Sequence, residues 1–510
     1  MSIQSELERI AFAKTAIRSA IEGKGVTVPS GTLIDGMAPL IDSIETGGGG
    51  TVNPTATAKA VNFRDYDGTI LYSYTVDEAA ALTELPPLPY QTGLICQGWN
   101  WSLDDIKAMG CGVEVGAMYI TNDRKTRIYI HLEDGRTSPM LGCCPNGTVT
   151  VDWGDGTEPD TLTGTSTSVV KWTPTHEYGA AGDYVIKLSV DGSVRFAGAG
   201  ITNEYSYLLR HSSGADGRNV VYQNAIQKVE IGDGVTLIGV NAFAYCCSLS
   251  SVTIPSGVTS IGDSAFGSCY LLSTVTIPDG VTSIGSSAFA NCYSLSSVTI
   301  PGGVTSIGNS AFSSCYLLST VTIPDSVTKI NSAFSGCCSL SSVTIPSGMT
   351  SIDNNAFYGC YSLSSVTIPD GVTSIGSSAF RNCCSLSSVT IPSGVTSIGS
   401  NAFYGCYSLS SVTISDSVTK IDTDAFRNCC SLSSVTIPSG MTSISAAVFY
   451  GCYGVRYYDF TRHTAVPTLS STSAFSNIAA DCEIRVPAAL ADEWKAATNW
   501  ATYADKIVGV

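Results

Sequence analysis

The chain has 510 residues, of which 44% are hydrophobic and only 13% are charged, and its formal net charge is −16. Its length allows several domains, and its apolar content is enough for packed cores, which excludes a wholly disordered chain. The negative charge argues against nucleic acid as a partner, because phosphate binding needs clustered Lys and Arg. No apolar run reaches about eighteen residues, so we expect no membrane insertion.

Residues 1–46 are predicted to form a helical leader. Leu7, Ile10, Ile17 and Ile21 recur at helical spacing, and the stretch LIDGMAPLIDSI predicts a second short helix. The leader lacks the apolar segment of a secretory signal. It resembles the leaders of tail-associated proteins from phages and prophages of Gram-positive bacteria, which implies docking onto other tail or virion proteins. A helical hairpin this short is marginal alone, so we expect a homo-oligomer, with a trimer as the obvious form for a fibre. The alternative is a helical cap on the next domain.

A glycine-rich linker at residues 47–58 precedes a small β-rich domain predicted at residues 59–121. The stretch VNFRDYDGTILYSYTV holds two alternating runs around Asp67 and Gly68, which predicts a β-hairpin. Asp65 and Asp67 would also suit a calcium loop, but the other oxygen ligands of an EF-hand are missing. The turn is therefore the favoured interpretation.

Residues 122–195 are predicted to form a β-sandwich, because VTVDWGDGT and HEYGAAGDYVIKLSV each combine short strands with tight turns. They resemble the PKD family, an immunoglobulin-like module. The resemblance implies a spacer or adhesive sandwich without chemistry of its own. A connector or N-terminal cap is expected at residues 196–228. The residues that carry the likeness are Trp153 to Gly156, His176, Tyr178, Gly182 and Tyr184.

From residue 229 to residue 457 the chain repeats itself. The triplet VTI recurs every 23 residues, except for a step of 22 between Val321 and Val343, where one residue is lost. Degenerate copies occur at Val229 and Tyr458. A fixed period in the twenties predicts a solenoid, in which each repeat is stabilised by its neighbours.

One repeat contains a core-facing strand, a Pro-Gly turn, a second pair of apolar anchors and a predicted short helical arc. The stretch IPSGVTSIGDSAFGSCYLL resembles the BspA-like, or Treponema-type, leucine-rich repeat. A C-terminal cap is predicted at residues 458–510, because residues 482–510 resemble the helical cap of such arrays. There Pro487 suits a helix N-terminus, and Trp494 and Trp500 can cover the last repeat. The residues of the repeat are Leu249, Val252 and Ile254 in the strand, Pro255 and Gly257 in the turn, Val258 and Ile261 as anchors, and Ala265, Phe266, Cys269 and Leu272 in the arc.

The predicted fold class is therefore mainly β with short helices: a leucine-rich-repeat solenoid preceded by a PKD-like sandwich and a helical leader. Ten cysteines occupy one position in successive repeats, from Cys246 to Cys452. We expect a ladder of reduced, packed thiols, with some disulfides or a metal site as the alternatives. Metal is disfavoured because CxxC pairs are missing and no histidine lies between residues 229 and 457.

No catalytic, cofactor-binding or metal-binding residues are predicted. The four histidines are scattered over different segments, and the sequence contains neither GxxxxGK[ST] nor HExxH. Asp152 and Asp155 belong to the WGDG turn, where they are expected to cap backbone amides, and His176 is expected to be structural. We therefore expect a protein without enzymatic activity.

Three functions remain open. The leader favours a phage tail-fibre or receptor-binding protein of the virion, assembled in the host cytoplasm, with a bacterial surface glycan or protein receptor as its partner. The repeats also suit a bacterial cell-surface adhesin of the BspA-like type, although no surface signal or anchor is evident. An intracellular interaction scaffold is the third interpretation, and an ice-binding solenoid a minor fourth.

Binding is predicted on the repeat array, through hydroxyl groups that recur in register from turn to turn and through an acidic position at every second turn. The alternative is that recent duplication produced this regularity and that the surface has no binding function. The candidate ligand-facing residues are Ser251, Thr253, Thr276, Thr299, Thr322, Thr344, Thr367, Thr390, Thr413, Thr436, Asp279, Asp325, Asp370 and Asp416.

Overall fold

The computed structural model describes residues 60–64, 70–87, 94–99, 103, 106–107, 114–121, 125–134, 136–165, 175–196, 207–211 and 219–510. The chain divides into two compact units, residues 1–122 and 123–510. The predicted leader and linker lie outside the described residues and stay predictions. None of the helices in the described part of the chain has the length and apolarity needed to cross a bilayer.

The first unit contains a four-stranded sheet in the order β2-β1-β4-β3. The predicted hairpin is confirmed by the antiparallel pairing of β1 with β2, whose intervening turn lies outside the described residues. Phe63 and Trp99 meet edge to face in the core, with ring centroids 4.9 Å apart. A capping box between Thr75 and Glu78 begins the short helix. The elements are β1 (Ala60–Arg64), β2 (Ile70–Thr75), α3 (Val76–Ala80), β3 (Leu94–Trp99) and β4 (Glu114–Thr121).

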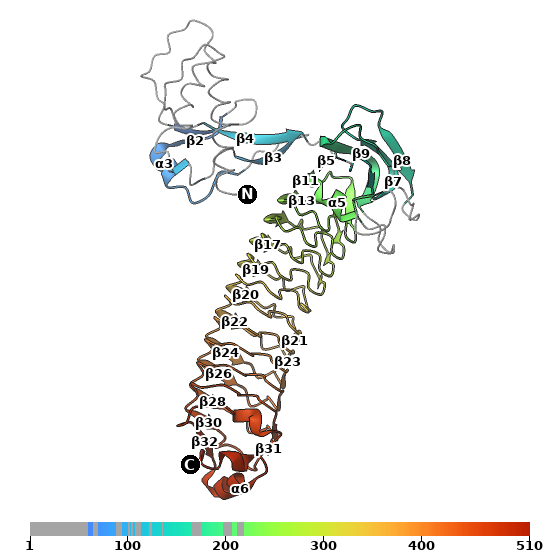
Figure 1. Ribbon diagram of the computed structural model, residues 1–510. Coiled ribbons are helices and arrows are strands. Elements are labelled where there is room, and N and C mark those ends of the chain that lie inside the picture. The colour runs from blue at the N-terminus through green and yellow to red at the C-terminus, as the bar shows by residue number, and fades with distance from the viewer. Residues whose placement is uncertain are drawn as a thin grey trace, which may run out of the picture. The chain divides into compact units, whose positions relative to one another are not determined.

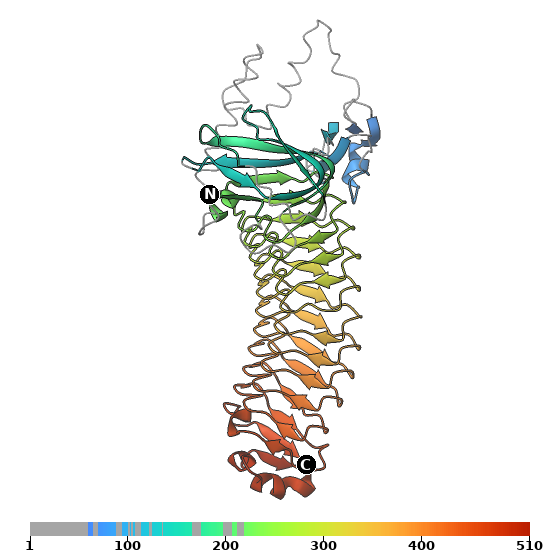
Figure 2. The same ribbon diagram turned by 90° about the vertical axis from the view of Figure 1, so that its right-hand side faces the viewer.

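The second unit begins with an antiparallel sheet that continues directly into the repeat array. The long strand β9 pairs with β7 along one edge and with β5 and then β12 along the other. Strand β5 in turn pairs with β11, and β11 and β12 start the two sheets of the array. Figure 2 shows these strands lying across the first repeats. They are β5 (Thr126–Leu132), β6 (Pro139–Leu141), β7 (Cys143–Asp152), β8 (Asp160–Gly164), β9 (Gly182–Phe196), β10 (Leu209–His211), β11 (Ile226–Glu230) and β12 (Val235–Ile238), with α5 (Asn219–Asn224).

The predicted solenoid is confirmed: each repeat forms one coil, and the coils stack in a column (Figure 1). The first face is built from parallel strands in strict register, such as Val252 beside Val275 and Val298. Its strands are β13 (Ser251–Thr253), β15 (Thr274–Thr276), β17 (Ser297–Thr299), β19 (Thr320–Thr322), β20 (Ser342–Thr344), β22 (Ser365–Thr367), β24 (Ser388–Ile391), β26 (Ser411–Ile414), β28 (Ser434–Thr436) and β30 (Tyr457–Asp459).

A second face runs along the column beside the first. Its strands are only two residues long, and each ends on a buried leucine or isoleucine side chain. They are β14 (Ser260–Ile261), β16 (Ser283–Ile284), β18 (Ser306–Ile307), β21 (Ser351–Ile352), β23 (Ser374–Ile375), β25 (Ser397–Ile398), β27 (Lys420–Ile421), β29 (Ser443–Ile444) and β31 (Thr468–Leu469).

The one-residue deletion between Val321 and Val343 interrupts this second face. On the second face, the ladder that starts at β12 ends at β18, and a separate ladder begins at β21. The coil between β18 and β21 carries no second-face strand. Asp353 lies across the gap and accepts a hydrogen bond from the backbone N–H of Ile330 at 2.8 Å. The first face, in contrast, pairs without a break from β19 to β20. A side chain thus replaces the missing ladder bond locally.

The third side of each coil was predicted to be a short helical arc, and this prediction is wrong. Ser264 and Ser268 have positive φ values of 51° and 62°, which a right-handed helix excludes. Successive four-residue turns form the arc instead, each closed by a bond such as Gly267 N–H to Ser264 C=O at 2.9 Å. The arc also bonds to the neighbouring coil, for example through Phe243 N–H to Ala265 C=O at 2.7 Å. The apolar spacing of the sequence therefore marks buried positions on turns. We call this side the third face.

The core of the array is a set of identical side chains stacked coil upon coil. Phenylalanine rings run from Phe243 to Phe449 with centroids 5.1–5.9 Å apart and planes within 13° of parallel. The Val, Ile, Ala and Leu positions around them are buried as predicted. Stacked aromatic rings add to the burial of apolar area.

The C-terminal end is covered as predicted, by Trp494 and Trp500, both fully buried. The indole N–H of Trp500 donates to the Pro467 carbonyl at 2.7 Å. Two further strands extend the first face beyond the repeats. The cap consists of η3 (Thr472–Phe475), β32 (Glu483–Val486), η4 (Ala488–Leu490), α6 (Ala491–Ala496), η5 (Trp500–Tyr503) and β33 (Ile507–Gly509).

The ladder cysteines are buried free thiols, in agreement with the predicted reduced ladder. Cys269 donates its S–H to the Phe243 carbonyl at 3.1 Å. Eight more cysteines, through Cys452, repeat this bond at 3.1–3.3 Å. Cysteine suits the position because it is small and apolar yet still offers a donor to the neighbouring coil.

Cys360→Ala tests this role of the ladder. The substitution removes a buried sulfur atom and its hydrogen bond to the Phe334 carbonyl, so we expect the free energy of unfolding to fall by about 1–2 kcal/mol. Cys384→Ala, in the half-buried neighbouring column, is the control and should change it by less than about 0.5 kcal/mol. Urea denaturation measures both, and equal effects would contradict a special role for the ladder.

Candidate functional site

The predicted ligand-facing threonines form one exposed column on the first face. In each strand the central valine points inward and its two hydroxyl neighbours point outward, as in β13. Pairing is in register from Thr253 through Thr367, and again between Thr390 and Thr413. All nine predicted threonines are exposed. The period of two within a strand and the constant spacing between coils together produce this column.

The hydroxyl groups of the array fall into two classes that sequence reasoning did not separate. Ser273 donates to the Ser250 carbonyl at 3.1 Å, and Thr282 to the Thr259 carbonyl at 3.2 Å. Both bonds recur along the array and join neighbouring coils. In the described part of the chain, the hydroxyls of the predicted threonine column make no such bond. They are therefore free to bind water or a ligand.

The four predicted aspartates are exposed at the turns that follow first-face strands in every second repeat. Asp416 pairs with Arg462 at 2.7 Å, and Asp325 accepts a bond from the Ser347 backbone at 3.4 Å. The remaining two are Asp279 and Asp370. The acidic position thus recurs periodically at the turns, and two of its members already have partners.

An alternating Tyr–Arg column on the third face was missed by sequence reasoning. Arg381 lies 4.5 Å from the ring centroid of Tyr404, and Arg427 lies 4.3 Å from that of Tyr450. Tyr358 begins the column, 5.8 Å from Arg381. Aligning the repeats would have revealed it, since these residues occupy one repeat position. Such cation–π contacts fasten successive coils.

Among the described residues, burial keeps cysteine side chains in the unreactive thiol form. Burial raises the pKa of Cys143 to about 12 and that of Cys482 to about 11. Burial also raises the pKa of ladder thiols such as Cys292 and Cys315 well above its usual value. A protonated thiol is neither a good nucleophile nor a metal ligand. Within the described residues, no three His, Cys, Asp or Glu side chains gather as metal ligands would.

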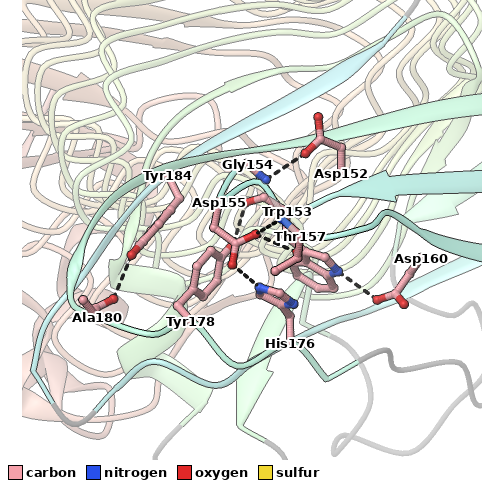
Figure 3. A network of polar contacts seen from close by, with 10 residues as sticks. All are labelled: Asp152, Trp153, Gly154, Asp155, Thr157, Asp160, His176, Tyr178, Ala180 and Tyr184. Carbon is pink, nitrogen blue, oxygen red and sulfur yellow. Dashed lines mark hydrogen bonds and ion pairs between the residues drawn. The ribbon is translucent and has the colours of Figure 1, made fainter.

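The WGDG turn at Trp153 to Gly156 and the residues around it form a closed polar and aromatic network (Figure 3). His176 stacks on Trp153 with ring centroids 4.8 Å apart, and its Nε2 lies 2.8 Å from Oδ2 of Asp155. The hydroxyl of Tyr178 donates to the Trp153 carbonyl at 2.9 Å, and the indole N–H of Trp153 donates to Asp160 at 2.8 Å. The side chains of His176 and Asp155 are only 12% and 14% exposed. Their contacts fix two turns of the antiparallel sheet formed by β5, β7, β8 and β9, which we call the cap sheet. This fits the structural role expected for His176.

The electrostatics of Asp155 follow from these contacts. Burial alone would raise its pKa, but hydrogen bonds from Thr157 and His176 outweigh burial and lower the pKa to about 2. Its ordinary value is 3.8, so the ionised carboxylate stabilises the fold fully above about pH 3.8. This contribution is lost as the pH falls through about 2.

Comparison with known proteins places the repeats in a family. Residues 217–337 and 331–456 match the family described as the BspA type leucine-rich repeat region. No curated protein matches the chain.

Several solved structures are similar to this chain. A leucine-rich cell surface protein from Faecalibacterium prausnitzii is 34% identical, with 58% of this chain and 86% of that chain covered and a TM-score of 0.39. The leucine-rich-repeat protein TpLRR of T. pallidum is 31% identical, with 38% and 88% covered and a TM-score of 0.31. A leucine-rich-repeat protein from Bacteroides ovatus is 25% identical, with 56% and 94% covered and a TM-score of 0.34.

Asp155→Asn tests whether the network stabilises the cap sheet in a pH-dependent way. At pH 7 we expect the free energy of unfolding to fall by about 1 kcal/mol, because the charged acceptor of three hydrogen bonds is lost. The difference from wild type should shrink as the pH falls from about 4 towards 2. Trp153 fluorescence in urea measures it. Asp191→Asn, at an exposed position of β9, is the matched control, and a pH-independent difference would rule out the carboxylate as the cause.

Proposed function

Because the chain belongs to the BspA-type leucine-rich-repeat proteins, we propose that it is a non-enzymatic adhesion protein displayed at a bacterial cell surface. In this role the repeat array is the binding part, and its first face contacts the partner. The cap sheet and the C-terminal aromatic cap close the two ends of the array.

The observation that carries this proposal is the column of free threonine hydroxyls on the first face. The neighbouring Ser and Thr ladders use their hydroxyls to join coils, whereas this column leaves its own unengaged. Neighbouring parallel strands lie about 4.8 Å apart, so the column offers donors and acceptors at a constant interval. Identical weak contacts at many points add up through multivalency.

The chemistry of this face selects the kind of partner. The exposed residues of the central strands are Ser and Thr, and carboxylates occur only at the turns. The face can therefore form hydrogen bonds but has no strong electrostatic potential of its own. A bacterial surface glycan, whose own hydroxyl groups recur along the chain, is the partner we favour. A protein receptor that presents an exposed polar strand is the alternative.

The tail-fibre role and the virion location rest on the likeness of residues 1–46 to phage tail leaders alone. The family match and the similar structures lend them no support. Neighbouring genes for tail, holin or lysin proteins would favour this second candidate.

Binding by the first face predicts a dependence on the number of coils. Deleting residues 366–411 in frame removes two coils and preserves the register, so the shortened array should fold and bind bacterial cells more weakly. Cell binding by the fluorescently labelled full chain and the deletion variant measures this. Unchanged binding by a folded deletion variant would reduce the array to a spacer.

A triple substitution tests the hydroxyls themselves. Thr299→Val, Thr322→Val and Thr344→Val together keep the shape and the strand preference but remove three free hydroxyls, so binding should weaken about tenfold or more. The control removes three exposed turn hydroxyls instead, through Ser256→Ala, Ser347→Ala and Ser393→Ala. If the control loses as much binding as the ladder variant, the threonine column is not the contact surface.

The predicted leader is testable without knowing its structure. Deleting residues 1–50 should leave the array folded but convert an oligomer into a monomer, because the remaining chain lacks the predicted association helices. Light scattering after gel filtration gives the mass. An unchanged oligomeric state would contradict the oligomerisation role of the leader.

A further inference from the structure

A cavity of about 450 Å³ lies on the third face at the beginning of the array. Its walls include Tyr207, which precedes the repeats, and Tyr245 from the first coil. The amides of Asn241 and Asn291 and several serine hydroxyls supply polar groups, and among the described residues no Asp, Glu, Lys or Arg contributes to the lining. The volume lies within the usual range for small-molecule sites, roughly 300–1,000 Å³.

The fold does not require the small residues that leave this space open. The cavity floor is formed by Ala244, Gly267 and Ala290, at the repeat position where later coils carry the Tyr–Arg column. Gly267 does not have a positive φ, so its backbone does not demand glycine. The same backbone therefore supports a filled third face in later coils and an open one in the first coils.

Tyr245 occupies a backbone conformation that disfavours a bulky side chain. Its φ is +63°, and the equivalent position in the other coils has the same left-handed conformation but carries only Ser, Asn or Gly. These residues tolerate that conformation, whereas a side chain like tyrosine is strained in it. Tyr245 is also 39% exposed, so burial does not compensate for the strain.

The cavity also holds a polar side chain with an unused donor. Ser268 is 8% exposed, and its hydroxyl oxygen accepts a hydrogen bond from the Asn291 amide at 3.4 Å. Among the described residues, no acceptor takes the proton of this hydroxyl. A nearly buried hydroxyl normally finds a partner, so a ligand atom can fill this role.

We propose that this cavity binds a neutral hexose or N-acetylhexosamine, as a free sugar or as the end of a glycan. The C–H face of a pyranose is apolar and suits the tyrosine rings, while its rim hydroxyls match the Asn amides and the Ser268 hydroxyl. The described residues of the lining carry no ionised side chain, so a charged ligand would lose its hydration there without gaining a counter-charge from them. Burial and the proximity of Tyr245 raise the pKa of Tyr207, which keeps its phenol neutral. This site is separate from the threonine column and does not rest on its role.

The experiment uses the full chain and four probes: methyl glucoside, methyl mannoside, methyl galactoside and N-acetylglucosamine, with glucuronate as a charged comparison. Saturation-transfer NMR and titration should give millimolar or tighter binding of at least one neutral probe and no binding of glucuronate. Ala290→Tyr, which fills the floor as Tyr358 does later in the array, should abolish binding. Ser335→Tyr, at the same repeat position but outside the cavity, should leave binding unchanged.

Tyr245→Asn separates a binding role from a structural one. Asparagine suits the left-handed position, so the thermal midpoint should rise or stay constant while affinity falls at least tenfold. The triple threonine variant should bind the probe normally, which distinguishes this site from the first face. The proposal is overturned if no neutral probe binds, if glucuronate binds better, if binding survives Ala290→Tyr, or if Tyr245→Asn lowers stability without weakening binding.

Discussion

Hydrogen bonding between neighbouring coils is the interaction on which the rest of this structure depends. A 23-residue repeat cannot offset its own conformational entropy, because ordering it costs at least about 23 kcal/mol for the backbone alone. Each coil therefore relies on the next: the first face through its parallel ladder, the third face through bonds such as Phe243 N–H to Ala265 C=O, and the interior through S–H bonds to phenylalanine carbonyls. Stability belongs to the column and not to the repeat.

The same dependence makes the two ends of the column special. An open coil would leave a row of unpaired backbone groups and uncovered apolar side chains. At one end β9, β5 and their neighbours continue both sheets into an antiparallel cap, held at its turns by the Trp153–His176 stack. At the other end two extra strands finish the first face, and buried tryptophans cover the last coil.

Uniform stacking also determines where functional features can arise. Repeated residues give a repeated surface, which suits weak recognition of a periodic partner along the threonine column. A single defined pocket requires a break in the repetition. The cavity on the third face has such a break, because Tyr207 comes from outside the repeats and Tyr245 replaces the Ser, Asn or Gly of the other coils.

The sequence by itself determined the solenoid, its period, the buried Val, Ile, Phe and Cys positions and the exposure of the strand threonines. These features follow from local alternation and from a repeat short enough to stack only one way. Only the tertiary structure decided the rest. The spacing of Ala265, Phe266 and Cys269 fits a helix as well as a series of turns, and the bonds to the next coil select the turns. Which hydroxyls are free, how β9 joins both sheets, and where Tyr207 meets the first coils depend on contacts between distant segments, which no local pattern encodes.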